Sequence, residues 1–192
     1  MIPQSTRSSV LCVAIAALLG AIGAYLASRC GGRLGLLDRP SVRGSHAETT
    51  PRAGGIGIAV GGVAAAIVFG WPAAGWLPMA GIAALGLVDD RWHVDPRLRL
   101  LVQCLLAGGS AVWLMWHFSL PLLTTGSMAI VCVLVLVGTT NIYNFMDGAN
   151  GMAGLMGVVV FGIIGVLALT IAEDVEIGKV ALIIAAACAG FL

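Results

Sequence analysis

Residues 152–172 read MAGLMGVVVFGIIGVLALTIA, an apolar run without a charged side chain. The hydrocarbon core of a bilayer is about 30 Å thick, and an α-helix needs about 20 apolar residues to cross it. The run meets that length and predicts a transmembrane helix. Strands are not expected here, because the chain shows no sustained alternation and because only helices or closed barrels satisfy backbone polar groups in lipid.

Working outward from this run, we predict an all-α, polytopic transmembrane helix bundle with about seven spans. The first run follows a short N-terminus containing Arg7, as in a signal peptide, but it is long for one and more spans follow, so we interpret it as a retained helix. The chain is predicted to be a single integral-membrane domain, residues 1–192, truncated at its C-terminus because the last run is short. The predicted spans are Val10–Ala27, Gly54–Gly70, Ala73–Val88, Leu100–His117, Leu122–Thr140, Met152–Ala172 and Gly178–Leu192.

The composition agrees with a membrane protein. The 192 residues are 59% hydrophobic and 10% charged, and the mean hydropathy is +1.03. Soluble domains carry roughly 25% charged residues, so a water-soluble chain of this composition could not cover its surface. The net charge of +1 predicts no nucleic-acid partner. The five cysteines are far apart and show no CxxC or zinc spacing, which favours small packing side chains.

The distribution of basic residues predicts the orientation. With seven spans, the first and third loops lie on one side and carry eight arginines, whereas the other side carries Arg7 and Lys179. The positive-inside rule places the arginine-rich side in the cytoplasm and the N-terminus outside. Four tryptophans fall at the predicted outer ends of spans, as in an interfacial belt: Trp71, Trp76, Trp113 and Trp116.

Three polar segments fall on the predicted cytoplasmic side, and the first is the loop GLLDRPSVRGSHAETTPRAGGIGI at residues 35–58. Arginines and a helix N-terminus bind phosphate, and a glycine pair lets the backbone approach an anion closely. The alternative is an ordinary positive-inside loop without a ligand. The candidate residues of this loop are Asp38, Arg43, His46, Thr50, Arg52 and the pair Gly54-Gly55.

The second segment contains Asp89 and Asp90 at the end of the third span, followed by Arg91, Arg97 and Arg99. A carboxylate at mid-membrane costs about 2.5–3.5 kcal/mol on insertion scales, so a pair is expected at the interface, in a polar cavity or on a cation. Carboxylates for a metal ion beside guanidinium groups for phosphate match the needs of Mg²⁺-phosphate chemistry. The alternative is a helix end that surfaces into water.

The third segment reads NIYNFMDGANG at residues 141–151. Asn141, Asn144 and Asp147 are spaced by three residues, so they lie on one face if the fifth span continues as a helix. Gly148 and Gly151 then interrupt the helix. We interpret Tyr143 and Phe145 as packing residues.

Together, the three segments resemble the polyprenyl-phosphate N-acetylhexosamine-1-phosphate transferase family, bacterial glycosyltransferase family 4, in its N-terminal portion. The resemblance rests on D-x-P...R...H...T-P-R-x-G-G from Asp38 to Gly55, on Asp89-Asp90, and on N-x-x-N-F-x-D-G-x-N-G from Asn141 to Gly151. It covers essentially the whole chain. The loop pattern and Asn150 look closer to the cell-surface polysaccharide branch, which includes O-antigen and lipopolysaccharide synthesis, than to the peptidoglycan branch.

The resemblance implies transfer of N-acetylhexosamine 1-phosphate from a UDP-sugar to undecaprenyl phosphate at the cytoplasmic face of the bacterial inner membrane, with release of UMP. It implies Mg²⁺, with Mn²⁺ as an alternative, and leaves a homodimer open. Asp89 and Asp90 would be catalytic. The implied metal residues are Asp90, Asn144 and Asp147, and the implied substrate-binding residues are Asp38, Arg43, His46, Thr50, Arg52, Arg97, Arg99, Asn141, Asn144 and Asn150.

The chain also departs from the family. Members commonly carry Arg-Lys where this chain has Arg43-Gly44, and they have ten or eleven spans, with a second acidic metal-binding motif and a histidine-containing loop in the later spans. Two rival interpretations therefore stay open. One is a truncated, non-catalytic membrane protein of the same family. The other is a transporter, although polar groups of a transporter site are expected near the midplane rather than at one face.

Overall fold

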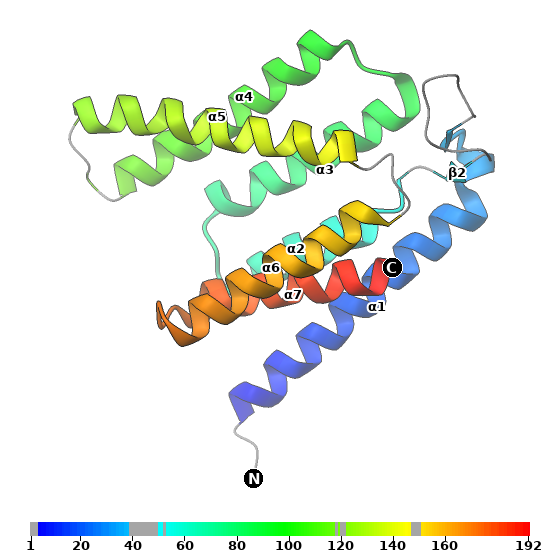
Figure 1. Cartoon of the computed structure of the whole chain (residues 1–192), viewed down its shortest axis with the longest axis horizontal. Helices are drawn as coiled ribbons and strands as arrows, with labels where there is room; N and C mark the ends of the chain where they lie inside the picture. The colour runs from blue at the N-terminus through cyan, green and yellow to red at the C-terminus, as the bar shows by residue number, and fades with distance from the viewer. Residues whose placement is uncertain (1–3, 39–49, 52, 118, 120–121, 147–150) are drawn as a thin grey trace.

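The computed structural model describes residues 4–38, 50–51, 53–117, 119, 122–146 and 151–192. Each of the seven predicted apolar runs falls mainly or wholly within one helix of this structure (Figure 1), which confirms the predicted helical bundle. The helices are α1 (Gln4–Leu34), α2 (Ile56–Val68), α3 (Ala73–Trp92), α4 (Pro96–His117), α5 (Leu122–Met146), α6 (Met152–Thr170) and α7 (Val175–Phe191).

Not every helix of this structure is long and apolar enough to cross a membrane. Among the described residues, four helical segments are long and apolar enough to cross a membrane: Ser9–Arg33, Pro96–His117, Gly126–Asn144 and Met152–Thr170. Helix α2 is apolar but shorter, α7 has 17 residues, and α3 ends in charged residues. The predicted count of seven spans is therefore not confirmed, whereas a multi-pass helical membrane protein is.

The helices form two groups. Helices α1, α2, α6 and α7 pack against one another, α4 packs against both α3 and α5, and the contact between α2 and α3 joins the groups (Figure 1). The chain reverses direction at each connection. As a result, the end of α1, the α3–α4 corner, the end of α5, the start of α6 and the C-terminus all lie toward the same side of the bundle, on the right in Figure 1. We call this side the polar end.

The first group is held together by glycine and alanine. A Cβ on Gly20 of α1 would collide with the backbone of Ala187 in α7, and a Cβ on Gly57 of α2 would collide with the backbone of Leu19 in α1. Small residues let helix backbones approach closely in lipid, where no hydrophobic force drives helices together. Gly57 thus serves helix packing in this structure. The core cluster consists of Ala16, Ala65, Ile183 and Ala187.

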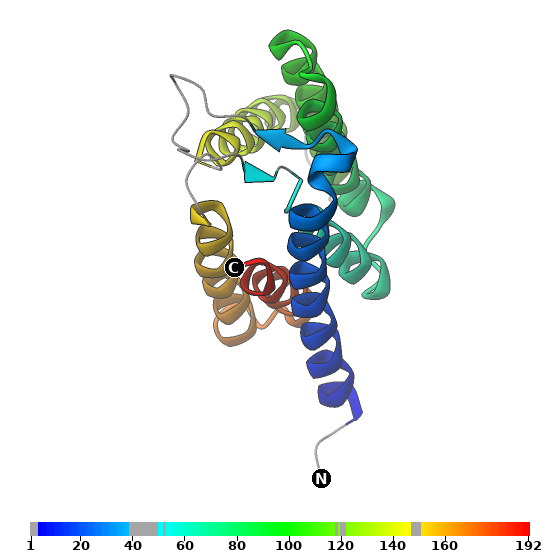
Figure 2. The same cartoon turned by 90° about the vertical axis from the view of Figure 1, so that its right-hand side faces the viewer.

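A short ladder pins the ends of the first loop. Helix α1 ends at a left-handed glycine, Gly35 with φ +68°, and the N–H of Leu36 donates to the carbonyl of Gly31 at 2.8 Å, as in a Schellman cap. Strands β1 (Leu37–Asp38) and β2 (Thr50–Pro51) then pair antiparallel, with Asp38 opposite Thr50. Viewed from the polar end, the ladder projects between the end of α1 and the end of α5 (Figure 2). These two-residue strands belong to the loop and not to a membrane span.

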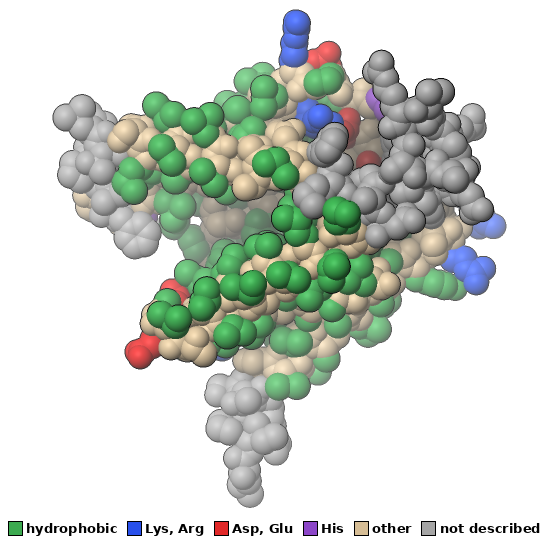
Figure 3. Space-filling view, viewed as in Figure 1, with side chains coloured by type: hydrophobic (Ala, Val, Ile, Leu, Met, Phe, Trp, Pro, Cys, Tyr) green, Lys and Arg blue, Asp and Glu red, His purple; other side chains and the backbone are tan. Residues whose placement is uncertain are grey.

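Apolar side chains cover the faces of the helices between the two ends. In Figure 3 they run along α5 and α6, whereas many of the charged side chains gather at the polar end. Ile130 and Leu134 of α5 and Ile163 of α6 are each more than half exposed. Exposed apolar side chains along a long helix are expected where lipid, and not water, surrounds it.

Candidate active site

The corner between α3 and α4 is organised by Asp89. Its Oδ1 accepts a hydrogen bond from the backbone N–H of Val94 at 2.9 Å, and its Oδ2 accepts from the guanidinium of Arg99 at 2.8 Å. The two side chains are 22% and 27% exposed, so the pair is partly shielded from water. Asp89 therefore links the end of α3 to the first turns of α4, with both of its carboxylate oxygens engaged.

Asp90 turns toward a different element. Its Oδ2 accepts a hydrogen bond from the backbone N–H of Ala53 at 3.1 Å, across 37 positions of sequence. Ala53 has φ +63°, in the left-handed region that favours glycine, and it directly precedes the Gly54-Gly55 pair. The structure thus brings the second predicted segment against the end of the first.

The glycine pair itself has two roles. A Cβ on Gly54 would lie 2.7 Å from the ring of Phe191 in α7, so a side chain at position 54 would displace that ring. A Cβ on Gly55 would meet no described atom within 4 Å, and Gly55 is the N-cap of α2 without a side-chain cap. Anion binding at the glycine pair stays a prediction, which now concerns Gly55 at the N-terminus of α2 rather than both glycines.

The arginines after the acidic pair differ from each other. Asp95 caps α4, with its Oδ1 accepting from the N–H of Arg97 at 2.8 Å, and Pro96 occupies the first helical position. Arg97 is exposed, and its guanidinium makes no ion pair with the residues that the structure describes. Arg97 is thus available to a phosphate group, whereas Arg99 is already paired with Asp89.

The third segment begins inside α5. Asn141 donates from its amide nitrogen to Oε1 of Gln103 in α4 at 2.7 Å and to the carbonyl of Val137 at 2.8 Å. Asn144, one turn later, is exposed, and within the described part of the chain its side chain has no hydrogen bond. The structure does not connect Asn144 with Asp89 or Asp90 through any contact between described residues.

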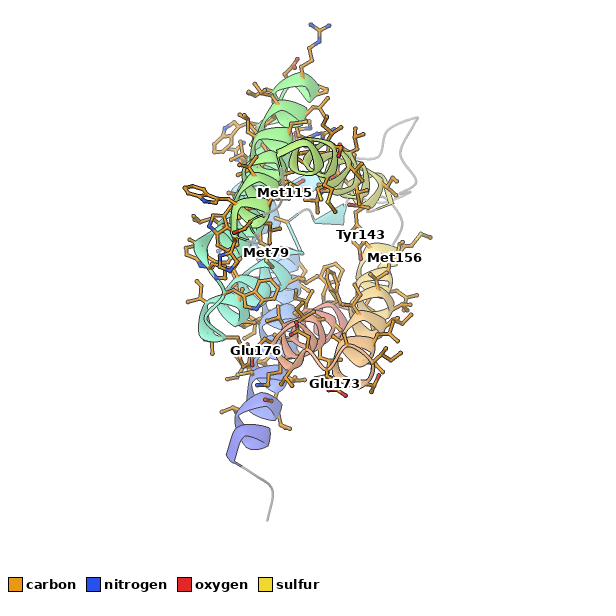
Figure 4. All side chains as sticks on the ribbon, turned by 90° about the vertical axis from the view of Figure 1, so that its left-hand side faces the viewer. Met79, Met115, Tyr143, Met156, Glu173 and Glu176 are labelled. Atoms are coloured by element: carbon orange, nitrogen blue, oxygen red, sulfur yellow. The ribbon has the colours of Figure 1, made fainter. Side chains whose placement is uncertain are left out.

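Two residues that the sequence did not assign to the site support this segment. Gln103 is 4% exposed, which is unusual for a polar side chain. Tyr143, expected only to pack, donates from its hydroxyl to the carbonyl of Ala153 in α6 at 2.8 Å; it lies between the α4–α5 pair and α6 (Figure 4). The position of Gln103 inside an apolar run was a signal that could have identified it, because uncharged polar side chains in such runs usually bond to a neighbouring helix.

Several predicted site residues lie outside what the structure describes. Asp38 and Thr50 are described as members of the ladder, without an account of their side chains. Arg43, His46, Arg52, Asp147 and Asn150 lie outside the described residues.

The described residues do not by themselves assemble a metal site. Mg²⁺ takes about six oxygen ligands in near-octahedral geometry. No group of three or more His, Cys, Asp or Glu side chains within the described ranges is placed to hold a metal ion, and Asp89 has both oxygens engaged. The predicted ligand Asp147 is not among those residues, so the predicted Mg²⁺ requirement gains no geometric support here.

The family can now be stated from comparison with known proteins. A sequence model of the family described as glycosyl transferase family 4 matches residues 72–192, which include the acidic pair and the asparagine segment. The chain belongs to glycosyl transferase family 4. The resemblance inferred from the three polar segments is thereby confirmed.

The relatives carry more specific names. The chain is 32% identical to a probable undecaprenyl-phosphate N-acetylglucosaminyl 1-phosphate transferase of Bacillus subtilis, over 83% of this chain and 48% of the relative. It is 34% identical to a phospho-N-acetylmuramoyl-pentapeptide-transferase of a Synechococcus species, over 74% and 47%. It is 27% identical to an undecaprenyl-phosphate alpha-N-acetylglucosaminyl 1-phosphate transferase of Yersinia pestis, over 74% and 42%.

The chain spans about half the length of these curated relatives, which fits the predicted N-terminal portion of the family. Relatives named for N-acetylglucosamine and for N-acetylmuramoyl-pentapeptide match at similar identity. The comparisons therefore do not separate the cell-surface polysaccharide branch from the peptidoglycan branch. No solved structure matches the chain.

Proposed function

We propose that this family 4 chain is part of an enzyme that transfers N-acetylhexosamine 1-phosphate from a UDP-sugar to undecaprenyl phosphate and releases UMP. The proposal rests on one observation above all: the hydrogen bond from Ala53 to Asp90 joins the acidic pair to the glycine-rich end of the arginine loop. Ala53 leads into Gly55 at the N-terminus of α2, so a carboxylate lies beside a helix N-terminus, and the exposed Arg97 follows on the α3–α4 corner at the same end of the bundle. The curated relatives are named as sugar-1-phosphate transferases.

The reaction needs positioning more than covalent help. An oxygen of the lipid phosphate forms a bond to the phosphorus that carries the sugar, and the bridging bond from that phosphorus to the uridine side breaks, so that UMP leaves. Phosphoryl transfer of this kind is catalysed chiefly by alignment of the two oxygens and neutralisation of developing charge. A site at the membrane surface lets a lipid-bound phosphate meet a water-soluble nucleotide.

In this proposal the described residues divide the work. Asp90 acts on the lipid phosphate, and Arg97 with the N-terminus of α2 neutralises phosphate charge. The pair of Asp89 and Arg99 holds the α3–α4 corner, which carries Asp90 and Arg97. Asn144 faces the sugar nucleotide from α5, and Asp147 follows it in the sequence. The polar end faces the cytoplasm of the bacterial inner membrane, with the N-terminus outside, as the eight arginines on that side favour.

The test uses the natural protein in its own membranes, supplied with UDP-N-acetylglucosamine and undecaprenyl phosphate. We expect UMP release from the wild type and at least about a hundredfold less from Asp90→Asn, since charge-dependent catalytic groups contribute about 10²–10⁴-fold. The Asp90→Asn protein should remain in the membrane in normal amount. Near-normal release by this variant would contradict the assignment of Asp90.

Two finer points belong to the same proposal. We propose a Mg²⁺ requirement and the cell-surface polysaccharide branch, with the identity of the N-acetylhexosamine open. Removal of divalent cations with EDTA should abolish UMP release, and added Mg²⁺ should restore it. Comparing UDP-N-acetylglucosamine with UDP-N-acetylmuramoyl-pentapeptide as donors separates the branches, because release with only the second donor would place the enzyme in the peptidoglycan branch.

A further inference from the structure

Gln103 is a buried polar residue in a helix that is otherwise apolar at this depth. It is 4% exposed and lies in the second turn of α4, about 10 Å along the axis from Pro96 at 1.5 Å per residue. An amide buried without a partner costs about 1–3 kcal/mol on protein scales. The buried Gln103 amide therefore needs a hydrogen-bond partner, which the structure supplies.

That partner belongs to the candidate active site. Oε1 of Gln103 accepts from the amide nitrogen of Asn141 at 2.7 Å, and the same nitrogen donates to the carbonyl of Val137 at 2.8 Å. Both hydrogens of the Asn141 amide are thus used inside the bundle. These two bonds orient the Asn141 side chain relative to its own helix and to α4, so they define the rotation of α5 about its axis at this turn.

The rotation of α5 decides where its next polar residue lies. Asn144 is three residues beyond Asn141 and so lies on a neighbouring part of the same helix face. On the other side, the hydroxyl of Tyr143 bonds to the carbonyl of Ala153 in α6 at 2.8 Å. Hydrogen bonds from Asn141 to α4 and from Tyr143 to α6 therefore hold this end of α5, and the described part of α5 has few other contacts with α6.

We infer that Gln103 is a positioning residue of the transferase: through Asn141 it sets the rotation of α5 and thereby presents Asn144 to the sugar nucleotide. This inference rests on the proposed function and adds to it a residue outside the three polar segments that carry the family resemblance. Gln103 does not touch substrate, because it is buried between α4 and α5.

The test is Gln103→Met in the natural full-length protein. Methionine keeps the length and volume of the side chain but cannot accept the hydrogen bond, so packing is retained. We expect the KM for the UDP-sugar to rise about tenfold, the usual order for loss of one buried hydrogen bond to a positioned group. The KM for undecaprenyl phosphate should stay within about twofold of the wild type, because Asn144 is assigned to the sugar nucleotide alone.

The matched control is Ser110→Ala, which also removes a polar group from α4. Ser110 lies two turns further along the helix, and its hydroxyl bonds to the carbonyls of Leu106 at 3.0 Å and Ala74 at 3.4 Å, away from α5. This variant should leave both KM values unchanged. In the double variant Gln103→Met with Asn141→Ala, the KM for the UDP-sugar should not exceed that of Asn141→Ala alone, because Gln103 acts through Asn141.

Three results would overturn the inference. Unchanged kinetics in Gln103→Met would show that the bond does not position the site. An equal rise in both KM values together with a lower melting temperature would show a structural role only. Losses that multiply in the double variant would show that Gln103 acts independently of Asn141. The two proposals fail in different ways. If the wild type releases no UMP, the proposed function fails and this inference fails with it. If the wild type is active and Gln103→Met is unaffected, only this inference fails.

Discussion

Asp89 and Asp90 are neighbours in the sequence, yet their carboxylates have different partners. Consecutive residues of an α-helix point about 100° apart, because one turn contains 3.6 residues. Asp89 thus reaches α4, and Asp90 reaches the end of the first loop. The sequence motif treats them as one pair, whereas the structure links Asp89 to α4 and Asp90 to the end of the first loop.

The connecting role of Asp89 predicts a stability effect. Asp89→Asn keeps an acceptor for Val94 but removes the charge pair with Arg99, and we expect unfolding to become easier by about 1–2 kcal/mol. The measurement is thermal unfolding in detergent. The control is Glu176→Gln, which neutralises the more exposed pair with Lys179 and should cost less than about 0.5 kcal/mol. Equal effects of the two variants would contradict the special role of Asp89.

Ala53 carries backbone strain that a single substitution can relieve. At φ +63° an alanine costs about 1–2 kcal/mol relative to glycine, part of which the greater flexibility of glycine in the unfolded chain offsets. We therefore expect Ala53→Gly to raise the melting temperature slightly, with a gain of up to about 1 kcal/mol. Ala53→Val, which is β-branched, should lower it. A lower melting temperature for the glycine variant would show that Ala53 is not in this conformation.

At the scale of whole elements, the two helix groups differ in how closely their helices approach. In the first group, a Cβ on Gly20, Gly57 or Gly190 would collide with the backbone of a neighbouring helix. In the second, Gly86, Gly109 and Gly138 face open space within the described structure, and a Cβ on Gly81 would meet the side chain of Leu106. Glycine has the same effect on the backbone in both groups. The difference lies in the neighbouring helix, which leaves no room for a side chain where it approaches the glycine closely.

This contrast predicts opposite outcomes for the same substitution. Gly57→Ala places a methyl group against the backbone of α1, and we expect a loss of about 1–3 kcal/mol in stability. Gly109→Ala, in the middle of α4, meets no atom within 4 Å and should be neutral or stabilising by up to about 1 kcal/mol through helix propensity. Thermal unfolding of both variants in detergent is the measurement. A tolerated alanine at position 57 would contradict the close approach of α1 and α2.

At the scale of the whole molecule, the reversal of the chain at each connection gathers polar segments that are about 100 residues apart. The β1–β2 ladder after α1, the α3–α4 corner and the end of α5 all lie at the polar end (Figure 1). The acidic turn before α7, with Glu173 and Asp174, lies at the opposite end. Such segregation is what an enzyme requires when one substrate is in the membrane and the other is in the cytoplasm.

The proposed orientation predicts which end is accessible from outside. In a background without the five native cysteines, Glu173→Cys should react with a membrane-impermeant maleimide in right-side-out vesicles. Arg97→Cys should react only after the vesicles are opened, because the proposed orientation places the polar end in the cytoplasm. Both positions are exposed, so access depends on the side of the membrane. Labelling in the reverse order would invert the orientation and place the site outside.

The sequence alone was sufficient for the properties that depend on local physics. Long uncharged runs determined the helices, since backbone groups in lipid must be paired within the segment, and the Asp89-Asp90 and Asn141–Gly151 patterns indicated the family. Only the tertiary structure decided which groups meet: Asp90 with Ala53, Asp89 with Arg99, and Gln103 with Asn141. Apolar periodicity says which segments are buried but not which side chains face each other across two helices. Hydrogen bonds require atoms about 3 Å apart, a condition that depends on how the helices pack and rotate against each other.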